Sequence, residues 1–261
     1  MKKILSAATF ALFASTQAFA IFGVGAHYVM NTGSLDGNKG PAYGLPEDPI
    51  SIDVEQKKTD GLKGIGFKAW IDLIPVVDIE GTLNIAATRY KTSLNIHTLT
   101  GDTIIDLSYT PDAPYSMIFG AADPLFGVVN GDLSVTYPFD LKILRPYIGV
   151  GFSYFASIPI VNASFANKML NNSKNEDLLA TLLDPTENPD AASKIGKALI
   201  NTLQNESYTT GIGGHIIAGL RIKPPIIPIA IYANGKYYFG GNTNSQFSQG
   251  FVLEAGGGFA L

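Results

Sequence analysis

The strongest constraint on the fold is a strict alternation of residue types at the C-terminal end of the chain. In residues 251–261 every second side chain is apolar or small, and Glu254 lies among the intervening positions. Residues 229–239 repeat the alternation, with Lys236 on the polar side. Because successive side chains of a β-strand point to opposite faces, each run predicts a strand with one apolar face and one polar face.

Residues 1–20 have the pattern of an export signal. Lys2 and Lys3 precede a short apolar stretch, and residues 18–20 read Ala-Phe-Ala, a small-x-small cleavage site. We expect the mature chain to begin at Ile21. The apolar stretch is too short to span a membrane comfortably as a helix. No cysteine lies near the cleavage site, so the sequence predicts no lipoprotein anchor.

Composition excludes several classes of function. The chain has no cysteine, which argues against a disulfide scaffold and against thiolate metal sites. The net charge is −4 and no run of Lys or Arg occurs, so nucleic-acid binding is not expected. After the signal no run of about 18 apolar residues appears, so a membrane would be crossed only by strands.

Eight segments of the mature chain alternate with a period of two. They are residues 21–31, 62–73, 77–90, 132–138, 146–156, 208–222, 229–239 and 251–261. All but 132–138 have about the 9 to 11 residues that a tilted strand needs to cross a bilayer. An outward apolar face and an inward polar face are the arrangement of a membrane β-barrel.

The connections between these segments alternate in length. Short connections marked by proline cover residues 73–77, 138–146 and 223–228. Long connections cover about 32–61, 91–131, 157–207 and 241–249. Short turns on one side and long loops on the other are typical of outer-membrane barrels. We therefore predict an all-β fold for residues 21–261, a closed up-and-down antiparallel transmembrane barrel of eight strands with its long loops outside the cell.

The long loops differ in character. Residues 32–61 are rich in Gly, Asp, Asn and Pro and predict a flexible surface loop. Residues 103–109 and 115–119 are strand-like, so they form either an exposed hairpin or an extra pair that would make ten strands. Ser173 with Glu176 has the spacing of a capping box before a leucine-rich stretch. A second helix is predicted from 189 to about 204. This helical insert is either a lid or partner-binding element, or a loop that packs on the barrel rim.

At pattern level the chain resembles the small outer-membrane β-barrel proteins, the OmpA/OmpX/OmpW-like group. The resemblance rests on the signal that runs into a first strand, the Asp-Leu-Ile-Pro turn at 72–75, residues 137–139 with 145–151, and the alternating last strand. It implies a bacterial outer-membrane location, contact with outer-membrane lipids, and insertion by the barrel-assembly machinery. Members usually end in an aromatic residue, whereas this chain ends in Leu261 with Phe259 two residues earlier.

The inward rows carry charges of both signs. An eight-stranded barrel encloses just enough space for its own side chains, and buried charges must be paired. The predicted lumen network consists of Lys68, Asp72, Asp78, Glu80, His215, Arg221, Lys236 and Glu254. One interpretation is a structural salt-bridge network. The other is a path for ions or small solutes, for which many inward glycines would leave room.

Catalysis, a metal site and a cofactor are not expected. The chain has three histidines, His27, His97 and His215, with no local cluster and no G-x-S-x-G motif. We therefore expect a non-enzymatic barrel with a structural or surface-contact role through its external loops. One alternative is a narrow channel. Another is a soluble periplasmic lipocalin-like barrel that binds an apolar ligand, which requires the apolar faces to point inward.

Overall fold

The computed structural model describes residues 22–44, 50–72, 76–99, 101–107, 123–139, 141, 143–172, 178, 181, 191–206, 208–224 and 227–260. The predicted export signal, residues 1–20, lies outside the described residues.

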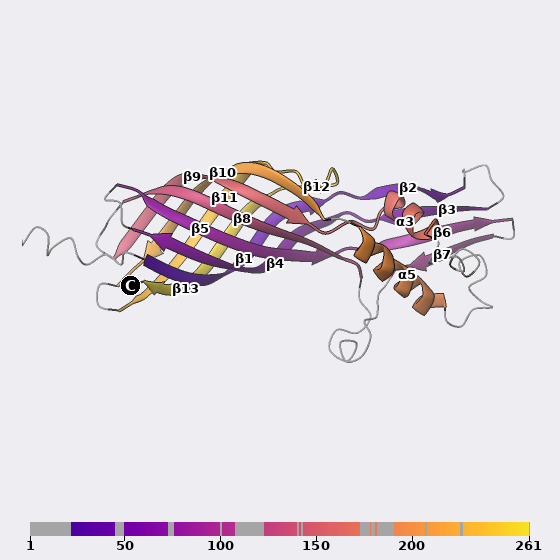
Figure 1. The fold of residues 1–261 in the computed structure, drawn as a ribbon, viewed down its shortest axis with the longest axis horizontal. Helices are drawn as coiled ribbons and strands as arrows, with labels where there is room; N and C mark the ends of the chain where they lie inside the picture. Colours follow the sequence, from indigo (N-terminus) through magenta and orange to yellow (C-terminus); the bar gives the residue numbers. More distant parts are fainter. Residues whose placement is uncertain are drawn as a thin grey trace, which may run out of the picture.

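Eight long antiparallel strands form a closed barrel (Figure 1). They are β1 (Phe22–Leu35), β4 (Thr59–Ile71), β5 (Asp78–Arg89), β8 (Leu125–Pro138), β9 (Leu144–Ser157), β10 (Thr209–Ile222), β11 (Ile229–Gly240) and β13 (Phe251–Ala260). Each pairs with the next in this order, and β1 pairs with both β4 and β13, which closes the ring. The two-residue strand β12 (Phe247–Ser248) pairs with the end of β1. The prediction of an eight-stranded closed antiparallel barrel is confirmed.

The two faces of each barrel strand meet different surroundings. On β4, Ile65 and Phe67 are 59% and 56% exposed on the outside, whereas Lys68 and Trp70 are buried inside. The same alternation runs along the other barrel strands. The outer wall is therefore apolar and the inner wall largely polar. The lipocalin-like alternative required the reverse arrangement and is wrong.

A second sheet extends from one end of the barrel. It contains β2 (Asn38–Tyr43), β3 (Ser51–Gln56), β6 (Thr92–Thr98) and β7 (Gly101–Asp106), in the order β2-β3-β6-β7. Two residues separate β3 from β4, and two separate β5 from β6, so the β4–β5 pairing continues as β3–β6 beyond the barrel. Figure 1 shows this sheet at the right of the barrel. We call this end of the barrel the sheet end and the other the turn end.

The prediction of a flexible loop at 32–61 is therefore wrong. The apolar residues Ala42, Ile52 and Val54 are buried in the core of this extension. They stand among Gly and Pro residues, which conceal the period-two pattern in the sequence. Residues 103–106 of the predicted strand-like segment 103–109 lie in β7, and β7 forms a hairpin with β6, a partner that the sequence did not predict. Residues 115–119 lie outside the described residues, and the barrel has eight strands rather than ten.

Two helices of the connection between β9 and β10 pack on the extension. The prediction of a helix at 189–204 is confirmed by α5 (Ala191–Asn205), which buries Ile195, Ala198 and Leu199. The sequence did not predict α3 (Ala163–Leu170), which contacts β2, β3 and α5. Of the helix predicted after Ser173, only Leu178 and Thr181 are described. In the part of the chain that is described, no helix is long and apolar enough to span a membrane.

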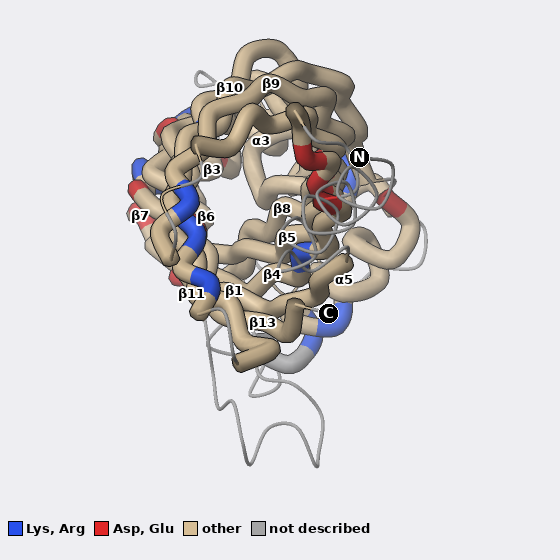
Figure 2. Tube along the Cα trace, turned by 90° about the vertical axis from the view of Figure 1, so that its left-hand side faces the viewer, with Lys and Arg blue, Asp and Glu red and all other residues tan. Residues whose placement is uncertain are grey.

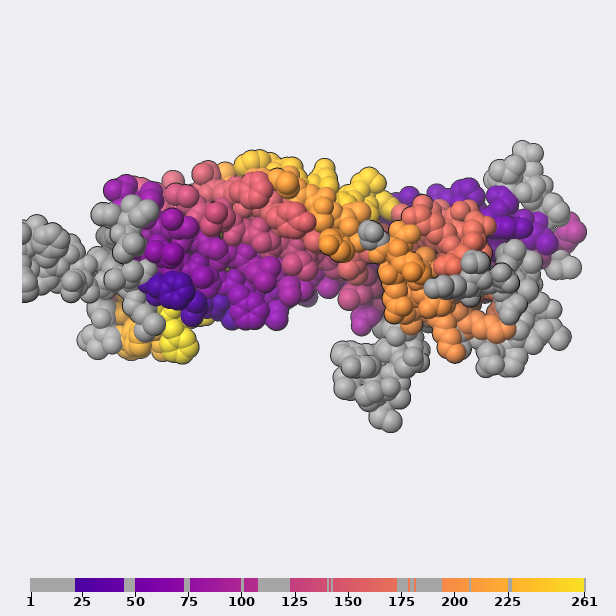
Figure 3. Space-filling model, in the orientation of Figure 1, coloured from indigo at the N-terminus to yellow at the C-terminus, as the bar shows by residue number. Residues whose placement is uncertain are grey.

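The hydrophobic core lies where the barrel meets the extension, and Figure 3 shows the two as one elongated body. Phe126 and Val128 of β8 and Phe155 of β9 belong to it. These inward residues explain an error in the predicted strand bounds. The sequence placed the fourth strand at 132–138, but β8 begins at Leu125, because its first inward residues are apolar and the alternation disappears there.

Candidate functional site

The charged lumen is the main candidate site. Figure 2 looks along the long axis and shows the ring of strands that surrounds it. Five acids and five bases lie in the described lumen or at its turn-end mouth. The acids are Asp72, Asp78, Glu80, Asp132 and Glu254, and the bases are Lys68, Arg145, Arg221, Lys223 and Lys236. With the histidines neutral, these formal charges cancel.

Two arginines and two aspartates form the cluster nearest the turn end. Arg145 and Arg221 are cross-strand partners on β9 and β10, where two like charges would repel each other. Arg145 lies 2.7 Å from Asp72 and 3.1 Å from Asp78. Arg221 lies 3.1 Å from the other oxygen of Asp72. The carboxylates therefore bridge the two guanidinium groups and offset their repulsion.

A second set of contacts joins this cluster to the middle of the lumen. Arg221 also pairs with Glu80, and Lys68 Nζ lies 2.8 Å from Glu80 Oε2. The guanidinium of Arg221 lies over the Trp70 ring, 4.7 Å from its centroid. Lys68 Nζ lies 4.9 Å from the centroid of the Tyr232 ring. Both cations are thus held by a carboxylate and by aromatic faces.

The third cluster centres on Lys236, which is fully buried. Its Nζ lies 2.7 Å from Asp132 Oδ2 and 2.7 Å from Glu254 Oε1. Asn84 Nδ2 donates to Glu254, so Asn84 Oδ1 is the acceptor for His27 Nε2 at 2.7 Å. Nδ1 of His27 lies 3.1 Å from the Tyr232 hydroxyl. With Asn84 Oδ1 as its acceptor, Nε2 of His27 carries a proton.

His215 lies near these ions but bonds to hydroxyl groups. Its Nε2 lies 2.8 Å from Ser134 Oγ and its Nδ1 lies 2.7 Å from Ser153 Oγ. The other seven residues of the predicted network lie within ion-pair distance of one another or of Asp132 and Arg145.

Three charged members of the network were not predicted from the sequence: Asp132, Arg145 and Lys223. Asp132 lies on the same inward face of β8 as Ser134, so the alternation of polar and apolar residues could have identified it. Arg145 lay one residue before the predicted start of its strand at 146, and β9 begins at Leu144.

The lumen is closed by apolar side chains at the sheet end. Leu35, Leu62, Phe126 and Phe155 are all fully buried there. The rings of Phe126 and Phe247 pack with their centroids 5.0 Å apart. Among the described side chains, no group of three or more His, Asp or Glu residues is placed to hold a metal ion.

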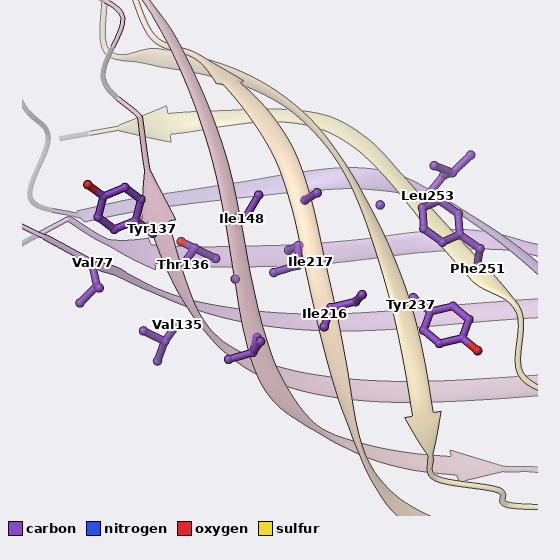
Figure 4. Close-up of a pocket in the computed structure, with 14 residues that line it drawn as sticks. Val77, Val135, Thr136, Tyr137, Ile148, Ile216, Ile217, Tyr237, Phe251 and Leu253 are labelled. Carbon is purple, nitrogen blue, oxygen red and sulfur yellow. The ribbon is translucent and has the colours of Figure 1, made fainter.

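The outer wall of the barrel has a shallow apolar groove of about 700 Å³. Figure 4 shows residues that line it, most of them from the outward rows of adjacent strands, among them Val135, Ile148, Ile216, Tyr237 and Leu253. The groove lies on the outer surface and not in the lumen.

Comparison with known proteins gives matches among solved structures only. No family model matches the chain, and no curated protein matches it. Neisserial surface protein A (NspA) is 13% identical, with 92% of this chain and 97% of that chain covered and a TM-score of 0.43. Ail, the attachment invasion locus protein of Yersinia pestis, is 8% identical, with 92% and 98% covered and a TM-score of 0.38. The outer membrane protein OprG from Pseudomonas aeruginosa is 12% identical, with 92% and 95% covered and a TM-score of 0.37.

This chain is similar in structure to small eight-stranded outer-membrane barrels.

Proposed function

We propose that the protein is an integral bacterial outer-membrane barrel with a sealed lumen, and that it displays its sheet-and-helix extension outside the cell as a surface-contact element. The observation that carries the proposal is the distribution of side chains across the barrel wall. Aliphatic rows such as Ile65 and Phe67 face outward, while ion pairs such as Lys68–Glu80 are fully buried. In water that outer wall would be an apolar patch far larger than soluble proteins expose; in a bilayer it faces hydrocarbon.

Exposed aromatic residues at both ends of the strands support the membrane assignment. At the turn end they are Phe22, Tyr137, Phe139 and Phe259, and towards the sheet end they are Tyr154, Tyr237, Phe239 and Phe251. Aromatic residues favour the two interfaces of a bilayer, where their rings lie at headgroup level. The span between the two sets is the proposed hydrocarbon-facing band.

The orientation follows from the connections. Strands at the turn end are joined by short connections, and the opposite end carries the second sheet and the helices. Outer-membrane barrels keep short turns in the periplasm and long loops outside. With the predicted export signal, this supports an outer-membrane location, contact with its lipids, and insertion by the barrel-assembly machinery.

The contents of the lumen argue against the channel alternative. The charges form pairs, and the sheet end is filled by Phe126, Phe155 and their neighbours. A contact role is therefore assigned to the extension. The outer face of its sheet presents Asp53, Glu55 and His97, and Asp102 of β7 bonds to His97 at 3.0 Å. In the part of the chain that the structure describes, no group of three or more His, Asp or Glu residues is placed to hold a metal ion, and the role that we propose is non-enzymatic.

Membrane fractionation with gel electrophoresis tests the proposal. We expect the protein to stay with the outer membrane after alkaline carbonate washing. The unheated sample should migrate differently from the boiled sample on a denaturing gel, because a folded barrel resists detergent. Protease added to intact cells should cleave the extension and leave a barrel fragment. Release into the soluble fraction, with no shift on heating, would overturn the proposal.

A further inference from the structure

Basic side chains gather on one side of the barrel at the sheet end. They come from the two places where barrel strands continue into the second sheet, the β3–β4 and β5–β6 junctions. We call the exposed residues Lys57, Lys58, Lys63, Arg89 and Lys91 the basic rim. The chain as a whole has a net charge of −4, so a local excess of positive charge at this rim is opposite in sign to the net charge.

The basic rim begins directly where the apolar band ends. Ile65 and Ile85 are exposed cross-strand partners within the band. The next outward position on β4 is Lys63, which pairs with Ala87. Arg89 is two residues further along β5 on the same face, so it is the diagonal neighbour of Lys63. In the proposed membrane these two cations lie at the level of the lipid headgroups.

The remaining three lysines lie just beyond. The backbone N–H of Lys57 donates to the carbonyl of Lys91 at 2.9 Å, which holds these two residues side by side. Lys58 lies 3.6 Å from Asp60, and both side chains are more than half exposed. The adjoining segments add two further acids, Asp36 and Asp123, so bases still outnumber acids five to three.

The asymmetry of the rim is a second observation. The described rim segments 156–162, 208–211 and 239–250 have no Lys, Arg, Asp or Glu. Arg89 donates one Nη1 bond to the carbonyl of Asp123 at 2.8 Å, which fixes the guanidinium group near the barrel wall. Among the described residues, no hydrogen-bond acceptor lies at the other nitrogen donors of Arg89, so these donors can bind two oxygens of a phosphate group. The long stem of Lys63 can lie along the wall with its ammonium at the interface.

We propose that the basic rim binds the headgroup phosphates of a phosphorylated lipid in the outer leaflet. Arg89 and Lys63 form charge-assisted hydrogen bonds to the phosphate oxygens, and Lys57, Lys58 and Lys91 add attraction. The acyl chains of the same lipid lie against the apolar band below. This inference rests on the proposed function, since it requires the band to lie in a bilayer.

The test compares two charge-matched variants of the full-length barrel. Lys63→Gln with Arg89→Gln removes two charges from the rim, and Lys194→Gln with Lys197→Gln removes two from α5. Each purified protein is titrated in detergent with diphosphoryl lipid A, and bound lipid is counted by native mass spectrometry. We expect the rim variant to bind about tenfold or more weakly than the wild type and the α5 variant to match the wild type. Added salt should weaken binding.

Three results would overturn the inference. Equal affinity of the two variants would do so, as would equal binding of a lipid without phosphate. Competition by millimolar inorganic phosphate that removes all lipid would indicate a free-phosphate site instead.

Heat-modifiable migration checks that each variant is folded. If the first variant does not fold, Lys57→Gln with Lys91→Gln repeats the test at the exposed junction. If the rim variant stays in the membrane fraction and binds lipid as the wild type does, this inference is rejected and the proposed function still holds.

Discussion

Lys68 and Glu80 form an ion pair inside the barrel, with Lys68 Nζ 2.8 Å from Glu80 Oε2 and neither side chain exposed. The pairing of β4 with β5 places Lys68 opposite Thr82 and Trp70 opposite Glu80, so the two charges meet on a diagonal. Two buried charges are tolerated as a pair, whereas one alone is strongly destabilising. Each buried charge in the lumen is therefore tolerated only because a charge of the opposite sign lies beside it.

The Lys236 cluster gives a direct test of this dependence. Lys236→Met leaves Asp132 and Glu254 buried without their shared cation, so we expect the free energy of unfolding to fall by about 3–5 kcal/mol. Urea unfolding of the folded protein in lipid vesicles measures this. The matched control is Lys58→Met, which removes an exposed pair with Asp60 and should cost about 0–1 kcal/mol. Equal effects of the two changes would contradict a lumen held by paired charges.

The outer face is tested by placing charge on the band. Ile231 is 59% exposed and lies on the outer face of β11. Ile231→Lys should lower stability in lipid by about 2–4 kcal/mol, and Ile231→Glu by less. Thr210→Lys, near the sheet end of β10, is the control and should have a smaller effect because it lies away from the middle of the band. Unchanged folding of Ile231→Lys in lipid would be evidence against the face assignment.

The barrel strands, whose two faces differ, were predictable from the sequence. In the extension only β7 overlaps a segment that was predicted to be strand-like, and β2, β3 and β6 were not predicted. Outward residues of a barrel strand are apolar because they face the bilayer, and inward residues are polar because they face paired charges. This alternation made segments such as 229–239 recognisable from the sequence. In the extension, β2 and β3 lie among glycines and prolines and pack against α3, a helix distant in sequence, which no local pattern reveals. The short helix α3 depends on one cap, where Asn162 Oδ1 accepts from Phe165 N at 3.0 Å.

The lumen residues were predictable as a set but not as pairs. Alternation placed Lys236 and Glu254 on inward rows, but their contact depends on the barrel register, which pairs Asn234 with Glu254 and Lys236 with Val252. Register is set by the closure of the whole ring and not by either strand alone. Arg145 was missed because proline follows it and the strand was predicted to begin at that proline.

A sealed lumen predicts an absence of conduction. The wild-type protein in a planar bilayer should give a conductance equal to that of the bare membrane, because ion pairs and the apolar layer around Phe126 and Phe247 fill the interior. A well-characterised porin in the same bilayer is the positive control. Discrete, reproducible channel openings would support the channel alternative instead.

Tyr90 links the barrel to the helical segment, and its loss should change the pH dependence of stability. Tyr90 follows β5, is buried, and its hydroxyl accepts from Val161 N at 2.7 Å. Burial raises the pKa of the Tyr90 hydroxyl above its ordinary value of 10.0. Above pH 10.0 the folded chain therefore keeps this proton while the unfolded chain loses it. The contribution of the Tyr90 hydroxyl to the free energy of unfolding is fully present below pH 10.0 and is lost as the pH rises above that value.

The variant Tyr90→Phe removes that contribution. We expect its free energy of unfolding to be lower by about 1 kcal/mol at neutral pH and to fall less steeply above about pH 10 than that of the wild type. Unfolding curves at several pH values, compared with Tyr208→Phe at an exposed tyrosine, measure the difference. Identical pH profiles for Tyr90→Phe and the wild type would show that Tyr90 is not buried in the folded protein.

The central claim, that the aliphatic rows face hydrocarbon and the charged rows face a sealed interior, is tested most directly by cysteine scanning along β5. The chain has no cysteine, so single cysteines at positions 79–86 can each carry a spin label. In lipid vesicles, labels at 79, 81, 83 and 85 should collide with oxygen dissolved in the bilayer, and labels at 80, 82, 84 and 86 should be shielded from it. A reversed alternation, or none, would contradict the account.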